Sequence, residues 1–113
     1  MKLFVLVLNK KEYLNKILEG FLDIGIHGAT VIDSTGMGQT LSSCKGSMFG
    51  GFRHLFENCQ VHNVTVFSAL DEEKVKEAKQ VVTDVVGDIS KPGTGIIFTM
   101  PLDFVSGLAE ESD

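Results

Sequence analysis

Two glycine pairs, widely separated in the chain, have the residue types and spacing that could bind an anionic ligand. The first pair is Gly36 and Gly38, and the second is Gly93 and Gly95. Glycine lets backbone N–H groups approach an anion closely, and a concave run of such groups can hold a phosphate. The same residues also fit a simpler interpretation, because a turn at the end of a strand often needs a positive φ. The residues alone leave both interpretations open.

Other kinds of chemistry have little support in the sequence. No nucleophile stands beside a plausible base, and no pair of carboxylates is marked out by its setting, so we do not expect an enzyme. Zinc needs about four ligands. The two cysteines, Cys44 and Cys59, and the three histidines are scattered without the spacing of metal ligands. We therefore predict no catalytic residues and no metal site.

Composition and charge narrow the class of protein. The chain has 113 residues, of which 43% are hydrophobic and 22% are charged, so we expect one folded domain over residues 1–113. A net charge of −5 without any basic stripe argues against nucleic-acid binding. The apolar run at 3–8 is far shorter than the roughly 20 residues of a membrane span, and it lacks the features of a signal peptide. We expect a cytoplasmic protein with no direct membrane insertion.

The hydrophobic patterns predict four strands and two helices. Residues 2–8 form a nearly continuous apolar run, typical of a strand that is buried on both faces in the centre of a sheet. Asn9 is a candidate N-cap for the helix that follows, and Asp71 is a candidate N-cap for the second helix. The expected elements are a strand at 2–8, a helix at 10–22, strands at 29–33 and 61–69, a helix at 72–85 and a strand at 96–100.

The order of these elements predicts the fold class. A βαββαβ order is typical of an α+β, ferredoxin-like fold, in which a four-stranded antiparallel sheet has both helices on one face. The other face of the sheet is then uncovered, although the strands carry apolar residues on both sides. A second subunit is the simplest cover for such a face. We therefore expect an oligomer.

A long segment rich in small residues separates the second and third predicted strands. Residues 36–51 contain five glycines and three serines. Loops of this length inside compact domains are usually functional. Met48 and Phe49 are apolar residues that would cost solubility in an exposed loop unless they contact something. We predict that these two residues bind a partner protein.

Three features in sequential order resemble the PII nitrogen-regulatory family, and the resemblance covers about the whole chain. Residues 35–40, TGMGQT in one-letter code, are similar to the Gly-x-Gly-x-Gln start of the family's long T-loop, so that 36–55 resembles this loop. A strand and an Asp-initiated helix then follow after a comparable length. The last feature is 87–95, which resembles the family's B-loop and leads into the similar closing strand GTGIIFTMP at 93–101.

The resemblance implies a homotrimeric signal-transduction regulator with ligand clefts between its subunits. In this family the T-loop base of one subunit and the B-loop of its neighbour hold ATP or ADP. The exposed T-loop, here 38–51, then docks on a partner enzyme or membrane transporter. Thr30 falls where the family has an adenine-contacting threonine. The resemblance gives as candidate ligand-binding residues Thr30, Gly36, Met37, Gly38, Gln39, Thr40, Lys91, Gly93, Thr94 and Gly95.

Two departures from the family bear on nucleotide binding. The family's phosphate-binding lysine, after the second glycine of the B-loop, is Ile96 here. The acidic tail at 103–113 lacks the two arginines that the family carries after its last strand. ATP or ADP is therefore one candidate ligand and a less charged small molecule is another. A trimeric metal-related or scaffold protein resembling the CutA family is a further alternative, because it shares the fold.

Overall fold

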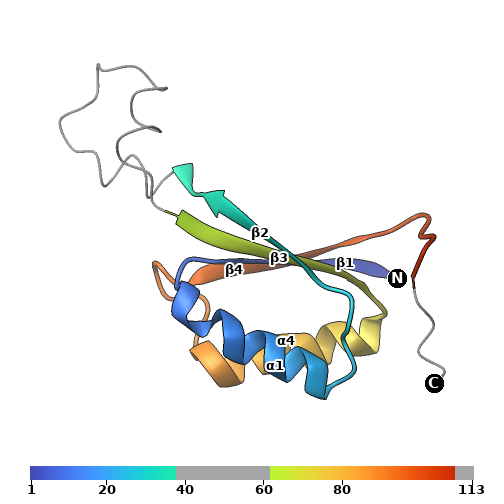
Figure 1. Ribbon diagram of the computed structural model, residues 1–113, viewed down its shortest axis with the longest axis horizontal. Coiled ribbons are helices and arrows are strands. Elements are labelled where there is room, and N and C mark those ends of the chain that lie inside the picture. Colours follow the sequence, from blue (N-terminus) through green and yellow to red (C-terminus); the bar gives the residue numbers. More distant parts are fainter. Residues whose placement is uncertain (38–61, 109–113) are drawn as a thin grey trace.

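The computed structural model describes residues 1–37 and 62–108. Its elements follow the predicted βαββαβ order, and a short 3-10 turn, η1, precedes the first helix (Figure 1). The α+β, ferredoxin-like fold class is thereby confirmed. The bounds are β1 Lys2–Leu8, η1 Lys11–Tyr13, α1 Leu14–Asp23, β2 Thr30–Thr35, β3 His62–Leu70, α4 Glu72–Val86 and β4 Gly95–Pro101.

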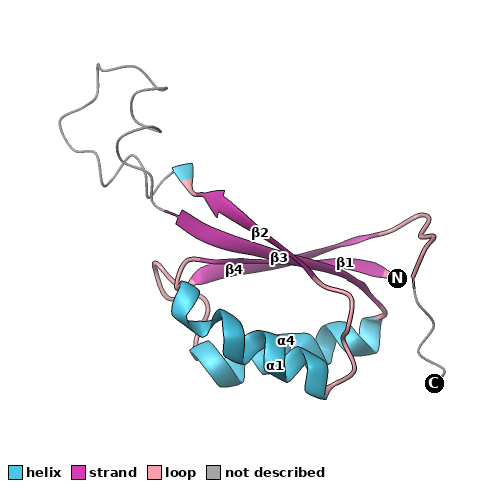
Figure 2. Ribbon diagram, in the orientation of Figure 1, coloured by secondary structure: helices cyan, strands magenta, loops and turns pink. Residues whose placement is uncertain are grey.

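The four strands form one antiparallel sheet in the order β2-β3-β1-β4. The first strand is central, as its continuous apolar run predicts, and it pairs with β3 on one side and β4 on the other. Figure 2 shows α1 and α4 together on one side of the sheet, so the sheet has one helix-covered face and one helix-free face. The outer strands β2 and β4 lie at opposite edges.

The hydrophobic core lies between the helices and the sheet. Phe4, Leu6 and Leu8 alternate along β1 and are fully buried, because successive side chains of a strand point to opposite faces. The ring of Phe4 meets that of Phe21 edge to face, with their centroids 6.0 Å apart. These side chains pack in one cluster with buried residues of β3, α1 and α4, which are Val64, Val66, Ile17, Ala78 and Val82.

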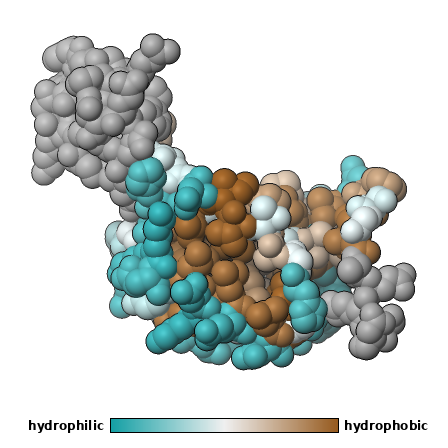
Figure 3. Space-filling view, in the orientation of Figure 1, coloured by the Kyte–Doolittle hydropathy of each residue, from teal (hydrophilic) through white to brown (hydrophobic). Residues whose placement is uncertain are grey.

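The helix-free face of the sheet is also apolar. Val5 of β1 is flanked by Phe67 of β3 and Phe98 of β4, which are its register partners on either side. On the outer strand β4, Phe98 keeps 41% of its surface exposed and Ile96 keeps 55%. Figure 3 shows the molecule from the side, with the sheet above the helices, and hydrophobic residues also gather on this side between hydrophilic ones. Within residues 1–37 and 62–108, this face therefore has the composition of a buried surface but stays partly exposed.

The two helix starts differ in their capping. Asp71 caps α4 as predicted, since its Oδ1 accepts a hydrogen bond from the backbone N–H of Lys74 at 2.8 Å. The predicted N-cap role of Asn9 is wrong. The chain makes the η1 turn first, the residue before that turn is Lys10, and no side chain caps it. The side chain of Asn9 is instead occupied by a contact to β3.

Candidate functional site

One end of the sheet collects the ends of all four strands. Because the strands are antiparallel, β1 and β2 finish at this end while β3 and β4 begin there. Two connections therefore leave from the same end: the long segment after β2, which resembles the T-loop, and the end of the 87–95 segment, which resembles the B-loop (Figure 1). We refer to them as the first loop and the second loop.

The two loops nevertheless stand at opposite edges of the sheet. The first loop follows β2 and the second precedes β4, and in the order β2-β3-β1-β4 two strands lie between them. With neighbouring strands about 4.7–4.9 Å apart, three spacings separate the two loop bases by about 14 Å. Within one chain the described glycines of the two loop bases, Gly36 on one side and Gly93 and Gly95 on the other, therefore do not form one compact site.

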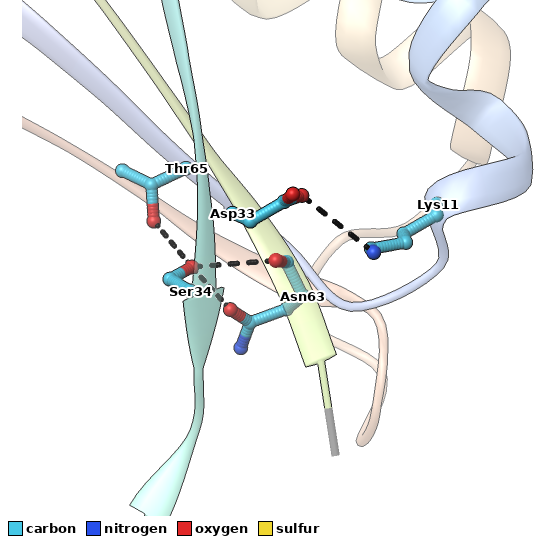
Figure 4. A network of polar contacts seen from close by, with 5 residues as sticks. All are labelled: Lys11, Asp33, Ser34, Asn63 and Thr65. Carbon is cyan, nitrogen blue, oxygen red and sulfur yellow. Dashed lines mark hydrogen bonds and ion pairs between the residues drawn. The ribbon is translucent and has the colours of Figure 1, made fainter. Parts of the chain in front are cut away.

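The base of the first loop is anchored by a network of polar side chains (Figure 4). Ser34 of β2 donates from Oγ to Oδ1 of Asn63 on β3, and its Oγ lies 2.9 Å from Oγ1 of Thr65. Asn63 is buried, with 4% of its surface exposed, and its Nδ2 donates to Oδ1 of Asn9 at 3.2 Å. Buried amides are costly unless they are hydrogen-bonded, so this network fixes the end of β2 where the loop leaves.

An exposed ion pair lies beside this network. Nζ of Lys11, just before α1, is 3.6 Å from Oδ1 of Asp33 on β2 (Figure 4). Both side chains are well exposed, and such pairs contribute about 0–1 kcal/mol to stability. The pair therefore marks a cationic group near the loop base without holding the loop in place.

The second loop is organised by its own short-range hydrogen bonds. The carboxylate of Asp88 accepts from Oγ of Ser90 at 2.6 Å and from the backbone N–H of Ser90 at 3.0 Å. Because these bonds favour the charged form, the hydrogen bond from the Ser90 side chain above all, the pKa of Asp88 lies below its ordinary value. Further along, the backbone N–H of Thr94 donates to the carbonyl of Lys91.

Glycine is required at positions 93 and 95 of the second loop for two different geometric reasons. Gly93 has φ 81°, a conformation that side chains of L-residues rarely adopt. A Cβ on Gly95 would lie 2.4 Å from the backbone oxygen of Val7, closer than any real contact. Gly95 is therefore required for β4 to approach β1 at this end, and the turn interpretation accounts for the pair without a ligand. Ligand contact at these glycines stays a prediction.

The candidate ligand-binding residues that the structure describes fall into two groups at this end and one exception. Gly36 and Met37 belong to the first loop, whereas Lys91, Gly93, Thr94 and Gly95 belong to the second. Thr94 is buried, and Met37, Lys91 and Gly93 are exposed.

Thr30 is the exception. It begins β2, five residues before Thr35, so it lies about 17 Å from the loop end of that strand at 3.3 Å per residue. It pairs with Phe67 and is exposed. Gly38, Gln39, Thr40, Met48 and Phe49 lie outside the described residues.

None of the four residues of the network at the base of the first loop, which are Asn9, Ser34, Asn63 and Thr65, was among the predicted site residues. Asn63 and Asn9 are its central pair. Asn63 stands second in a β3 strand that is otherwise mostly apolar, and asparagine is disfavoured in strands. This polar interruption is the signal that could have identified it. Asn9 was interpreted as a helix cap, and its contact to Asn63 depends on strand register. Each of these residues links two neighbouring strands.

The described part of the chain contains neither a cluster of metal ligands nor a membrane-spanning helix. Within residues 1–37 and 62–108, no group of three or more His, Cys, Asp or Glu side chains is placed to hold a metal ion. In the same part of the chain, no helix has the length and apolar character required to cross a membrane.

The sequence also matches a model of a known protein family. The family model described as "Nitrogen regulatory protein P-II" matches residues 1–111. No curated protein matches the chain. The family match covers both loops and every strand and helix described above.

Proposed function

Because the chain belongs to the nitrogen regulatory protein P-II family, we propose that it is a homotrimeric regulator that senses a small ligand in clefts between its subunits. Proteins of this family are non-enzymatic signalling proteins, and the chain is a PII-type signalling regulator. This membership favours a PII-type regulator over the CutA-like alternative.

The observation that carries the proposal is the position of the two loops. Both leave the same end of the sheet, yet β3 and β1 lie between their bases. A ligand held by both glycine pairs therefore needs the first loop of one subunit and the second loop of another. A cleft between neighbouring subunits meets this requirement, and the resemblance to the family implies the same arrangement.

The apolar helix-free face supports the assembly. Val5, Phe67 and Phe98 form a continuous apolar row across three strands, and Ile96 extends it beside the second loop. Burying such a surface stabilises an interface by about 25 cal/mol per Å². A trimer that covers this face would also place the second loop at a subunit boundary, because Ile96 directly follows Gly95.

The charge around the second loop bears on two candidate ligand classes. The backbone N–H groups of the glycine segments could bind an anion, which supports an adenine nucleotide. Lys91 is an exposed cation in the second loop, five residues before Ile96. Ile96 itself brings an apolar side chain where the family has a lysine, and this observation favours a second candidate class: a small ligand with less negative charge than ATP.

Regulation of a partner forms the other half of the proposal. We infer that the 38–51 segment, with Met48 and Phe49, contacts a partner enzyme or membrane transporter. Support comes from the sequence, because these apolar residues occur in a long glycine- and serine-rich segment. The segment follows directly from Met37, so a ligand at the loop base would lie beside the start of the partner-binding segment.

A thermal-shift panel tests ligand sensing. The panel contains MgATP, MgADP, cyclic dinucleotides, 2-oxoglutarate and bicarbonate, each with the full chain. A ligand present at 100 times its dissociation constant stabilises the folded protein by about 2.7 kcal/mol. We expect one class to raise the melting temperature. Gly93→Ala should reduce this ligand-induced shift because it strains the second loop at φ 81°, whereas Gly28→Ala should preserve it because its Cβ would meet nothing within 4 Å. If no class shifts the transition, small-ligand sensing is contradicted.

A further inference from the structure

A chain of hydrogen bonds crosses the end of the sheet from the second loop to the base of the first. The backbone N–H of Asn9 donates to the carbonyl of Thr94 at 3.0 Å. The side chain of Asn9 accepts from Nδ2 of Asn63 at 3.2 Å, and Oδ1 of Asn63 accepts from Oγ of Ser34. These contacts pass from the segment before β4, across the end of β1 and the start of β3, to the end of β2.

Asn63 is the central member of this chain. It is 4% exposed, so water offers little substitute for a lost partner, and an unsatisfied buried polar group costs about 1–3 kcal/mol. Its amide is held from both sides, by Asn9 at the nitrogen and by Ser34 at the oxygen. A rotation of the amide therefore weakens both hydrogen bonds together. Figure 4 shows the Asn63 side chain beside Ser34, with Thr65 on the other side of that hydroxyl.

The start of the first loop lies beside this amide. A Cβ built on Gly36 would lie 3.1 Å from Nδ2 of Asn63, tighter than most real contacts. The backbone of Gly36 therefore lies next to the nitrogen that donates to Asn9. A shift of the loop base toward β3 would press on the same atom that forms the bond toward the second loop.

We propose that Asn63 is a positioning residue that couples the two loops of one chain. Movement at Gly36 displaces the Asn63 amide, which alters its bond to Asn9. Because the N–H of Asn9 holds the carbonyl of Thr94, the second loop moves in turn. The consequence for ligand binding rests on the proposed function: a ligand at one loop would change the geometry of the other loop of the same subunit. The coupling itself does not depend on which ligand binds.

The coupling can be tested without a ligand by the substitution Gly36→Ala, because the added Cβ should displace the Asn63 amide. Gly36 does not have a positive φ, so alanine acts through its Cβ and not through backbone strain. The readout is the amide of Asn9, followed by its NMR chemical shift and its hydrogen-exchange rate. We expect Gly36→Ala to shift this signal and to speed its exchange about fivefold, as weakening of one hydrogen bond predicts. The control Gly28→Ala should leave the Asn9 amide unchanged.

The Gly36→Ala substitution is then repeated in chains in which the hydrogen bond between Asn63 and Asn9 has been removed. In an Asn63→Ala background, Gly36→Ala should no longer affect the Asn9 amide. Asn9→Ala provides a second background, which removes the acceptor for Nδ2 and leaves Asn63 in place should Asn63→Ala fail to fold. An equal response to Gly36→Ala in either background, or no response in the natural chain, would overturn the proposal. Either result leaves ligand sensing untouched, because the thermal-shift panel measures that separately.

Discussion

Replacing Phe98 by aspartate is expected to break the proposed trimer into monomers. Phe98 lies on the helix-free face opposite Val5, and 41% of its surface is exposed in the single chain. An unpaired carboxylate buried in an apolar interface costs about 3–5 kcal/mol. At 1.4 kcal/mol per decade, the dissociation constant of the assembly should rise by about two to four decades. Sedimentation velocity at micromolar concentration measures the change.

Thr99→Asp is the matched control for this substitution. Thr99 is the next residue of β4, it is exposed, and it points to the opposite face of the sheet. Thr99→Asp introduces the same charge on the same strand. Because Thr99 points away from the helix-free face, this substitution should leave the proposed trimer intact. Circular dichroism should show that both variants stay folded. Equal dissociation by the two variants would mean that the helix-free face is not the interface.

Weak binding of MgATP is the second large effect that we expect. The family's lysine is Ile96 here, and no Arg or Lys follows Pro101. A hydrogen bond to a charged group contributes about 1.5–3 kcal/mol, so losing two or three of them weakens binding by about two to six decades relative to typical family members. This is an upper range, since such contributions rarely add fully. Titration calorimetry with ATP and magnesium measures the affinity.

Ile96→Lys should restore part of this affinity. Ile96 is 55% exposed in the single chain and directly follows Gly95, so a lysine there would stand beside the ligand cleft that we propose at the subunit boundary. One charge-assisted bond predicts tighter binding of MgATP by about one to two decades. Ile96→Gln, which has polarity without charge, is the control and should gain little. A micromolar or tighter constant in the natural chain would contradict the prediction and would point to Lys91, in which case Lys91→Ala should abolish binding.

Much of the fold could be predicted from local patterns. The continuous apolar run of β1 correctly indicated a central strand, because a strand with a neighbour on each side and apolar contacts on both faces needs no polar positions. Asp71 was a correct N-cap prediction because its oxygen bonds to an N–H only three residues away. Helix and strand order followed from periodicities of the same short range.

The contacts at the candidate site were beyond such reasoning. Asn9 and Asn63 are 54 residues apart, and they meet only because β1 and β3 pair in one particular register. Local sequence favoured Asn9 as a helix cap, since asparagine is common at that position. In the structure the side chain of Asn9 instead accepts a hydrogen bond from Asn63, because the buried amide of Asn63 at the start of β3 needs an acceptor. A single sequence contains no information on that register.

The separation of the two loop bases in space also follows from the strand order, which local sequence patterns do not reveal. Sequence motifs place two glycine pairs in one chain and predict nothing about their separation in space. The order β2-β3-β1-β4 puts the bases of the two loops, at Gly36 and at Gly95, at one end of the sheet and at opposite edges. This geometry makes the subunit boundary central to the proposed function.

Cross-linking between the two loops tests this central claim most directly. Met37→Cys and Ile96→Cys are introduced together in a chain with Cys44→Ser and Cys59→Ser, and a short bismaleimide is added at micromolar protein concentration. Both positions are exposed in the single chain, and Ile96 directly follows the second loop. Within one chain the two loop bases lie about 14 Å apart, so a shorter cross-linker should not join them. If the two loops of neighbouring subunits meet, we expect covalent dimers and trimers under denaturing electrophoresis. We expect only monomers when either cysteine is present alone. A doubly substituted chain that gives no product larger than one chain would contradict it.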